Sequence, residues 1–380
     1  MHATVFSGAI LGVDGLIVEV EVDLSRGIPS FSIVGLPNTA VRESRERVTA
    51  AIKNSGLEFP LQRITVNLAP ADVKKEGAAF DLGIAMGIIL AAARKKTPDG
   101  TRDNGLPGTL FLGELALDGS IRPVRGVLPV LLHGKNGGFE RAVIPRGNFS
   151  ESLPVSGIEV FGAATLRDVV STVRGMGETI DFSAGDAGDE GDGEGRPSVL
   201  HKARGDARKI GCALASAGAG DLDMQEVVGQ ESVKRALTVA AAGGHHVLMV
   251  GPPGAGKTML ARRFSSILPP LGEQAALETT MIYSIAGLLS ADGLVTTSPF
   301  RSPHHSASDA GLIGGGNMPR PGEVTLAHNG VLFLDELPEF KRHVLETLRE
   351  PLEEGRIVIS RARQAVAFPA RFQLVAAMNP

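Results

Sequence analysis

Apolar and polar positions along the first 175 residues follow the periods of short strands and longer helices. Alternation predicts strands at residues 4–10, 16–22, 30–34 and 63–68, and a helical period predicts helices at 38–55 and 79–93. Later strands are predicted at 109–114, 141–144 and 157–161, with helices at 127–133 and 165–174. Strands mixed with helices in this way indicate an α+β or α/β domain.

The pattern stops in the middle of the chain and resumes near residue 221. Residues 183–196 alternate glycine with acidic residues and offer no large apolar group, so we expect a disordered linker there. A short helix at 209–217 is the sole element predicted between the two patterned regions. We therefore divide the chain into a first domain (1–175), a linker (176–220) and a second domain (221–380).

The second domain shows strand–loop–helix units. A helical period covers 225–242, a short apolar strand covers 246–250, and a glycine-rich loop and a helix from Lys257 follow. Apolar strands recur at 331–334 and 373–377. Units of this kind predict a parallel sheet covered by helices, so the fold class is α/β.

Composition narrows the classes of protein. The chain has 380 residues, a net charge of −4 and one cysteine, Cys212, which excludes an internal disulfide and fits a reducing cytoplasm. The start lacks a secretory signal, and the apolar run at 82–93 is too short to span a bilayer. Any binding of nucleic acid must use a local basic patch. The chain has no tryptophan and one tyrosine, Tyr283, so we do not expect stacking of bases on aromatic rings to be the main mode of nucleic-acid binding.

The glycine-rich loop matches the phosphate-binding pattern G-x-x-x-x-G-K-[ST] in full. Its residues are Gly251, Pro252, Pro253, Gly254, Ala255, Gly256, Lys257 and Thr258. Glycines let backbone N–H groups approach phosphates, and the helix that follows presents its positive end to the anion. Lys257 supplies a charge near the β- and γ-phosphates of ATP, and the Thr258 hydroxyl is a ligand for Mg²⁺. A strand before the loop and a helix after it are the context that this motif requires.

Two further strands end in polar residues. Asp335 and Glu336 follow the apolar strand 331–334, at the end of a strand where open α/β sheets bind ligands. We expect Asp335 to hold Mg²⁺ and Glu336 to act as general base on the attacking water. The alternative is that both acids only begin the next helix, where they would favour its positive end. Because a phosphate-binding loop is present in the same domain, we favour the functional role. Asn379 ends the last strand, where its amide is expected to orient that water.

These three motifs, in this order, resemble the AAA+ ATPases. Val228 and Gly229 resemble the segment that contacts adenine in that family. The stretches 300–306, 314–316, 319–323 and 326–337 look like its magnesium-chelatase branch. An AAA+ module continues through an arginine finger and a helical lid, so we expect residues 1–380 to be an incomplete module that binds ATP and hydrolyses it slowly.

The first domain resembles the proteolytic domain of Lon at 75–80 and 113–119. Ala79 stands at the position of the Lon serine and Val130 at that of the lysine, so the resemblance implies the fold without the peptidase chemistry. A Lon-like domain before a chelatase-type ATPase resembles the ComM/YifB family. That resemblance implies a cytoplasmic ring of six copies that binds ATP and Mg²⁺ and acts on DNA as a helicase in recombination or transformation, with no membrane partner.

Other readings of the sequence stay open. A magnesium-chelatase subunit, an ATP-dependent protease and a partner-recruiting module are the alternative functions. Arg356, Arg361, Arg363 and Arg371 flank a predicted hairpin at 357–368, where they either face phosphates or pair with acids and neighbouring subunits. We expect structural roles, and no metal, for the paired histidines at 304–305 and 245–246.

Overall fold

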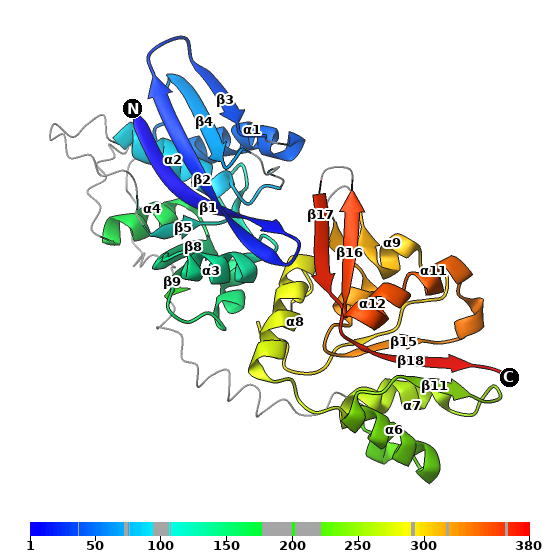
Figure 1. Ribbon diagram of the computed structural model, residues 1–380. Coiled ribbons are helices and arrows are strands. Elements are labelled where there is room, and N and C mark those ends of the chain that lie inside the picture. The colour runs from blue at the N-terminus through cyan, green and yellow to red at the C-terminus, as the bar shows by residue number, and fades with distance from the viewer. Residues whose placement is uncertain are drawn as a thin grey trace. The chain divides into compact units, whose positions relative to one another are not determined.

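The computed structural model describes residues 1–36, 38–71, 75, 77–93, 106, 108–176, 200–201, 222–289, 293–316, 319–361 and 364–380. The chain divides into two compact units, Met1–Asp206 and Ala207–Pro380 (Figure 1). The predicted linker at 183–196 and the predicted helix at 209–217 lie outside the described residues, as does Cys212.

An eight-stranded mixed sheet forms the first unit, in the order β10-β9-β8-β5-β1-β2-β4-β3. The strands are β1 (His2–Leu11), β2 (Asp14–Ser25), β3 (Ser30–Val34), β4 (Arg63–Ala69), β5 (Thr109–Phe111), β8 (Arg141–Pro145), β9 (Glu159–Ala163) and β10 (Leu200–His201). Strands β1, β5, β8 and β9 pair in parallel, whereas β2 runs antiparallel to both β1 and β4. The long β1–β2 pair, blue in Figure 1, therefore joins a parallel half of the sheet to the half that ends at β3.

Helices cover both faces of this sheet. They are α1 (Thr39–Asn54), α2 (Asp81–Ala93), α3 (Val127–Asn136) and α4 (Leu166–Gly175). Successive strand residues point to opposite faces: Ser7 lies against Gly83 of α2, whereas Gly8 lies against Val130 of α3. A Cβ at Gly8 would come within 2.2 Å of a Val130 methyl, so glycine is what allows α3 to pack this closely.

Helix α2 is the centre of the first core. All its residues from Asp81 to Ala91 are buried, and the helix predicted at 79–93 is confirmed. The strand predicted at 109–114 is shorter than expected. Strand β5 ends at Phe111 because Gly113 takes a φ of +157°, and Glu114–Leu115 then pairs with Ile121–Arg122 in a separate two-stranded ladder.

A buried ion pair joins α1 to the start of α2. Arg47 Nε donates to Asp81 Oδ2 at 2.7 Å and its Nη2 donates to Asp81 Oδ1 at 3.1 Å, while Asp81 is fully buried. Leu115 N also donates to this carboxylate, at 3.3 Å. Burial raises the pKa of Asp81, and the hydrogen bonds from Arg47 and Ser44 act against that rise. The carboxylate thus fixes α1, α2 and the Glu114–Leu115 ladder to one another.

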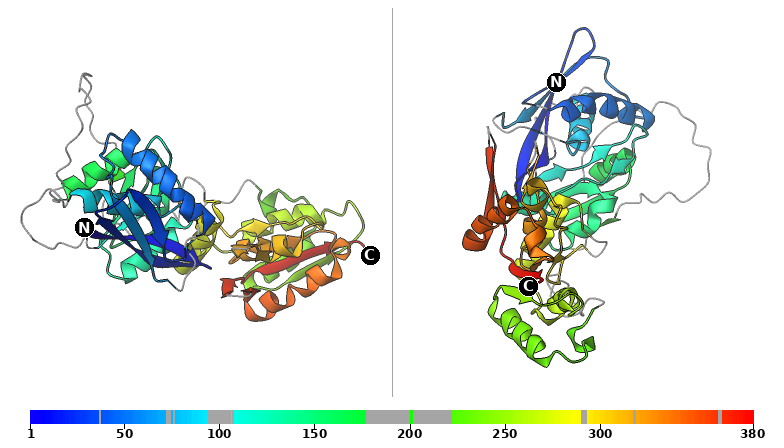
Figure 2. Two further views of the ribbon diagram at one scale, coloured as in Figure 1. Left: turned by 90° about the horizontal axis from the view of Figure 1, so that it is seen from above. Right: turned by 90° about the vertical axis from the view of Figure 1, so that its right-hand side faces the viewer.

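The second unit is built on a four-stranded sheet whose neighbours are all parallel, in the order β11-β18-β15-β12. Its strands are β11 (Val247–Val250), β12 (Phe300–Arg301), β15 (Val331–Leu334) and β18 (Gln373–Met378). Its helices are α6 (Glu231–Gly243), α7 (Lys257–Arg263), α8 (Glu273–Ala286), α9 (Asp309–Leu312), α10 (Glu323–Leu326), α11 (Arg342–Glu346) and α12 (Arg349–Glu354). Strand β18, drawn in red, can be followed through this unit in Figure 2. The α/β prediction is confirmed.

Two antiparallel ladders complete the second unit: β13 (Gly314–Gly315) with β14 (Arg320–Pro321), and β16 (Arg356–Arg361) with β17 (Gln364–Pro369). The second of these is the predicted hairpin. The helix predicted from residue 225 begins later, at Glu231, because Gly229 and Gln230 both have positive φ angles, 75° and 58°. Helix α8 was not predicted, since its apolar and polar residues show no clear helical face.

We expect Asp81→Asn to lower the free energy of unfolding of the first unit by about 3 kcal/mol, because it leaves the Arg47 guanidinium beside a neutral amide in a buried site. Urea denaturation followed by circular dichroism measures this. The matched control is Glu46→Gln, which removes the exposed partner of Arg45 and should cost less than about 1 kcal/mol. Equal losses in the two variants would show that the buried pair contributes no more than a surface pair.

Candidate nucleotide site

Three strand ends meet at one edge of the parallel sheet of the second unit. Strand β18 pairs with β11 on one side and with β15 on the other, all in the same direction. The carboxyl ends of parallel strands lie along one edge, where α/β sheets bind ligands. The loop after β11, Asp335 after β15 and Asn379 after β18 are therefore neighbours, as the sequence motifs predicted.

The loop from Gly251 to Gly256 has the backbone that a phosphate cradle requires. Gly254 and Gly256 have φ angles of +78° and +82°, in the left-handed region that favours glycine. Gly251 N donates to Met378 O at 3.3 Å, which fastens the start of the loop to β18. No atom lies within 4 Å of a Cβ built at Gly254, so backbone conformation, and not a lack of space, calls for glycine there.

Lys257 connects this loop to the end of β18. Its Nζ donates to Gly251 O at 2.6 Å, to Pro252 O at 2.9 Å and to Asn379 Oδ1 at 3.0 Å. An ammonium group has three donors, and these three acceptors use all of them. The lysine of the first motif and the asparagine of the third, 122 residues apart, are thus in direct contact.

Thr258 connects the loop to the end of β15. Its hydroxyl donates to Asp335 Oδ2 at 2.7 Å, and Asp335 Oδ1 accepts from Glu336 N at 3.0 Å. A hydroxyl and a carboxylate in contact are the oxygen donors that Mg²⁺ prefers, with water and phosphate oxygens completing its octahedron. The residues present therefore fit a magnesium–nucleotide complex.

Glu336 lies at the rim of the same edge. Its backbone is left-handed (φ 52°, ψ 49°), and its carboxylate Oε2 is 3.6 Å from His305 Nδ1. The His305 ring lies against the His304 ring with centroids 4.0 Å apart and planes tilted by 37°, and it meets the buried Phe340 ring edge-on with centroids 6.5 Å apart. Sequence reasoning missed His305 as a neighbour of Glu336. His305 follows β12, which pairs with β15, and the sequence analysis predicted no strand at this position.

One histidine of each predicted pair, His304 and His246, accepts a hydrogen bond from a backbone N–H. His304 Nδ1 accepts from Ser306 N at 3.2 Å, and His246 Nδ1 accepts from Leu374 N at 3.0 Å, which ties β11 to β18. Within the described residues, no group of three or more histidine, cysteine or acidic side chains is arranged to hold a metal ion.

The segment predicted to contact adenine is exposed. Val228 keeps 96% of its surface accessible, and Gly229 follows it with a φ of +75°. Lys234 Nζ donates to Val227 O at 3.1 Å and fixes the segment to α6. An exposed apolar side chain beside a left-handed glycine suits a contact with a flat base, and this role stays a prediction.

One of the arginines near the hairpin forms an ion pair, and the phosphate-binding role stays a prediction. Arg356 pairs with Glu354 at 3.0 Å, in agreement with the ion-pair alternative. Arg371 lies just after β17, and a Cβ at Gly355 would come within 2.9 Å of its Cγ, so its side chain crosses the base of the hairpin. The side chain of Arg361 and the whole of Arg363 lie outside the described residues.

Comparisons with known proteins agree with this site. A family model described as "Magnesium chelatase, subunit ChlI" matches residues 223–380, and one described as "Subunit ChlI of Mg-chelatase" matches residues 20–148. The Competence protein ComM of Haemophilus influenzae is 44% identical over 378 residues, which cover all of this chain and 68% of that protein. The protein YifB of Escherichia coli is 43% identical over 99% of this chain and 67% of its own length. The chain belongs to the ComM/YifB family. It is accordingly an AAA+-type protein of an ATPase family.

Two relatives of lower identity have names that refer to a protease and to a chelatase subunit. Lon protease 2 of Bacillus subtilis is 33% identical over 36% of this chain, and the magnesium-chelatase 38 kDa subunit of Rhodobacter capsulatus is 28% identical over 40%. The similarity to Lon fits the Lon-like first domain. In that domain Ala79 O accepts a hydrogen bond from Gly113 N at 3.0 Å, and Val130 packs against Gly8 of β1; the loss of the Lon peptidase residues at these positions stays a prediction.

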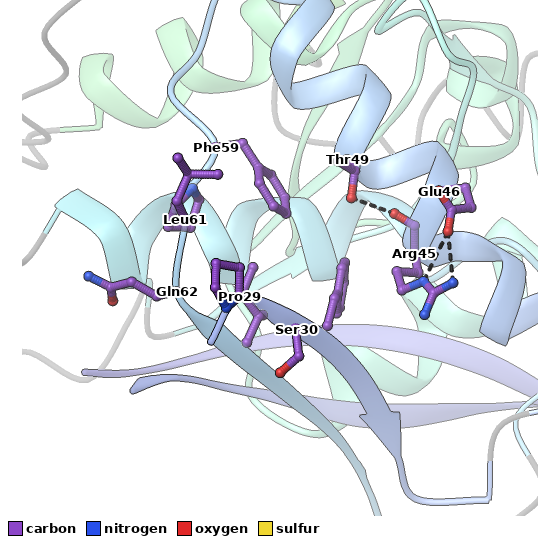
Figure 3. Close-up of a pocket in the computed structure, with 11 residues that line it drawn as sticks. Pro29, Ser30, Arg45, Glu46, Thr49, Phe59, Leu61 and Gln62 are labelled. Atoms are coloured by element: carbon purple, nitrogen blue, oxygen red, sulfur yellow. Dashed lines mark hydrogen bonds and ion pairs between the residues drawn. The ribbon is translucent and has the colours of Figure 1, made fainter. Parts of the chain in front are cut away.

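A separate pocket of about 260 Å³ lies in the first unit, away from these motifs (Figure 3). It is lined by Pro29, Ser30, Phe31, Arg45, Glu46, Thr49, Phe59, Pro60, Leu61, Gln62 and Ile64. Its two charged residues, Arg45 and Glu46, bind each other at 2.8 Å, and the rest of the lining is largely apolar. This pocket has no arrangement of groups for catalysis. Among the described residues, no helix combines the length and hydropathy needed to cross a membrane.

We expect Lys257→Met to lower the affinity for Mg–ATP at least tenfold, about 1.4 kcal/mol, because the substitution removes the one charge that the loop offers to phosphates. Binding of a fluorescent ATP analogue measures this. Lys53→Met, which removes a lysine that lies over Phe59 in the first unit, is the control and should leave the affinity unchanged. Equal affinities for Lys257→Met and the unmodified chain would place the nucleotide elsewhere.

Proposed function

We propose that this chain binds and hydrolyses ATP at the Gly251–Thr258 edge and uses the energy to act on DNA. One observation carries the proposal: Lys257 contacts Asn379 and Thr258 contacts Asp335, so three motifs far apart in sequence form a single site. A phosphate loop beside two acidic residues, Asp335 and Glu336, and a strand-end amide is suited to phosphoryl transfer to water.

The residues have separate roles in this proposal. Backbone N–H groups of the loop and Lys257 bind the phosphates, with Lys257 exchanging its contacts to Gly251 O and Pro252 O for phosphate oxygens. Thr258 and Asp335 hold Mg²⁺, which when bound neutralises charge on the β- and γ-phosphates. Val228 and Gly229 contact the adenine.

Glu336 and Asn379 act on the attacking water. The Glu336 carboxylate accepts a proton from the water, and the Asn379 amide orients it toward the γ-phosphate. Both residues follow the ends of the paired strands β15 and β18, at the edge where Thr258 contacts Asp335. The His305 imidazole, 3.6 Å from Glu336, limits the directions in which the carboxylate can turn.

DNA is the proposed substrate, and six copies of the chain are the proposed assembly. Support comes from the family, since a relative identical at 44% over the whole chain is named a competence protein. A net charge of −4 means that phosphate contacts must come from a local patch, and the hairpin arginines outside the Arg356–Glu354 pair supply candidates. We propose a cytoplasmic location, in agreement with a single cysteine.

Metal insertion into a porphyrin is the second candidate, because two family models described as chelatase subunits match this chain. One of these matches lies in the first unit, so the presence of a domain before the ATPase does not by itself separate the two functions. The ComM relative is 44% identical over the full chain, against 28% over 40% for the chelatase subunit. This difference favours the DNA-acting function.

The test is ATP hydrolysis by the purified protein with branched DNA, single-stranded DNA, casein or protoporphyrin. We expect DNA to raise the rate and the other two additions to have no effect. Glu336→Gln should lower kcat by at least about 100-fold while ATP binding persists, since the amide cannot accept the proton. The nearby Glu339→Gln, in the turn after β15, serves as the control.

Stimulation by protoporphyrin and not by DNA would replace the DNA-acting function with the chelatase function. Full activity of Glu336→Gln would remove Glu336 from the proposed chemistry and leave the nucleotide site itself in place.

A further inference from the structure

His328 is a buried histidine in the stretch 326–337, three residues before β15, and it was given no role in the predicted nucleotide site. Its side chain is 2% exposed. Its Nδ1 accepts a hydrogen bond from Arg371 N at 3.0 Å, and its Nε2 lies 3.4 Å from Glu278 Oε2 on α8. One imidazole therefore connects α8, the turn before β15 and the segment that leads from the hairpin into β18.

The contacts define the state of this ring. Because Nδ1 accepts from a backbone N–H, the proton of the neutral imidazole lies on Nε2 and points to Glu278. Burial lowers the pKa of His328, and the nearby Arg371 charge lowers it further, while Glu278 acts in the opposite direction. The ring is held neutral, with a fixed acceptor on one side and a fixed donor on the other.

Asn329 strengthens the same connection. Its backbone has a φ of +57°, its N donates to Arg371 O at 2.7 Å, and its amide donates to Ala275 O and Thr279 Oγ1, both at 3.2 Å. Arg371 thus has its N–H bound by the His328 side chain and its carbonyl bound by the Asn329 backbone. The segment entering β18 is clamped at one residue from both of its backbone groups.

This clamp lies where the two functional strands begin. Gln373 N donates to Gly330 O at 2.9 Å, and the ladder then runs from Val331 opposite Gln373 to Leu334 opposite Ala376. Asp335 and Asn379 stand at the far ends of these strands. The two strands are short, four residues in β15 and six in β18. A shift at the start of either strand therefore also moves its far end, which leads to Asp335 or Asn379.

We infer that His328 is a positioning residue for ATP hydrolysis: through its Nδ1 it fixes the entry of β18 beside β15 and so sets the placement of Asn379 relative to Asp335. The inference rests on the proposed ATPase function of the site. A small displacement of a group that orients the reacting water is enough to reduce turnover by one or two orders of magnitude.

Two isosteric substitutions separate the two sides of the ring. In His328→Asn the amide oxygen lies near the position of Nδ1 and can accept from Arg371 N, whereas in His328→Gln the amide nitrogen lies near Nε2 and can donate to Glu278. We expect His328→Gln to lower kcat roughly tenfold with KM for ATP within about twofold, and His328→Asn to keep kcat within about threefold. His328→Leu, which has neither group, should behave like His328→Gln if it folds.

The result that overturns the inference is equal kcat for the asparagine and glutamine variants, whether high or low, since a structural role would not distinguish them. Amide hydrogen exchange at residues 371–378 gives a readout that does not need ATP. We expect faster exchange there in His328→Gln than in His328→Asn. If the unmodified protein fails to hydrolyse ATP, the proposed function fails, and the exchange difference still tests the clamp.

The lowered pKa of His328 gives a further expectation for the pH dependence of stability. The unfolded chain takes up the proton near pH 6.5, before the folded chain does, so acidification favours unfolding. The contribution of His328 to stability is therefore complete above pH 6.5 and declines as the pH falls below it. Urea unfolding at pH 7.5 and pH 5.5 should show a smaller loss on acidification in His328→Asn, and an unchanged loss would assign the effect to other groups.

Discussion

The parallel pairing of β18 between β11 and β15 is the constraint on which the second unit depends. Strand direction brings the phosphate loop, Asp335 and Asn379 to the same edge, and the order of the strands places Asn379 between the other two. The two direct contacts, Lys257 with Asn379 and Thr258 with Asp335, follow from that order.

A second constraint acts at the opposite ends of the same strands. There two side chains bind backbone N–H groups: His328 accepts from Arg371 N, and His246 accepts from Leu374 N. Both histidines accept from a backbone N–H of the segment that carries Asn379. The functional edge and its supporting edge are thus linked through β18, whose first residues are bound by two imidazole rings that the nucleotide-site motifs do not include.

Most of the fold and the chemical motifs of the site could be predicted from sequence, because their causes are local. Alternating apolar residues mark β1 to β4, the all-apolar run marks α2, and the phosphate loop is defined by its own glycines and lysine. The errors have physical reasons. Two left-handed residues, Gly229 and Gln230, delay the start of α6, and Gly113 ends β5 early. Helix α8 lacks a clear apolar face because it lies between partners on several sides, with both Thr279 and Ile282 buried.

What sequence could not predict are the contacts that depend on three-dimensional proximity between unrelated segments. The contact of His305 with Glu336, the His328–Arg371 bond and the buried Asp81–Arg47 pair join residues 31, 43 and 34 positions apart. The Asp81–Arg47 pair is the example in the first unit. Asp81 lies two residues after Ala79, and Ala79 stands at the position where the resemblance to Lon implies a serine. The Asp81 carboxylate, at the start of α2, binds Arg47 and Leu115 N. Asp81 is therefore the point at which two helices and a strand ladder are held together.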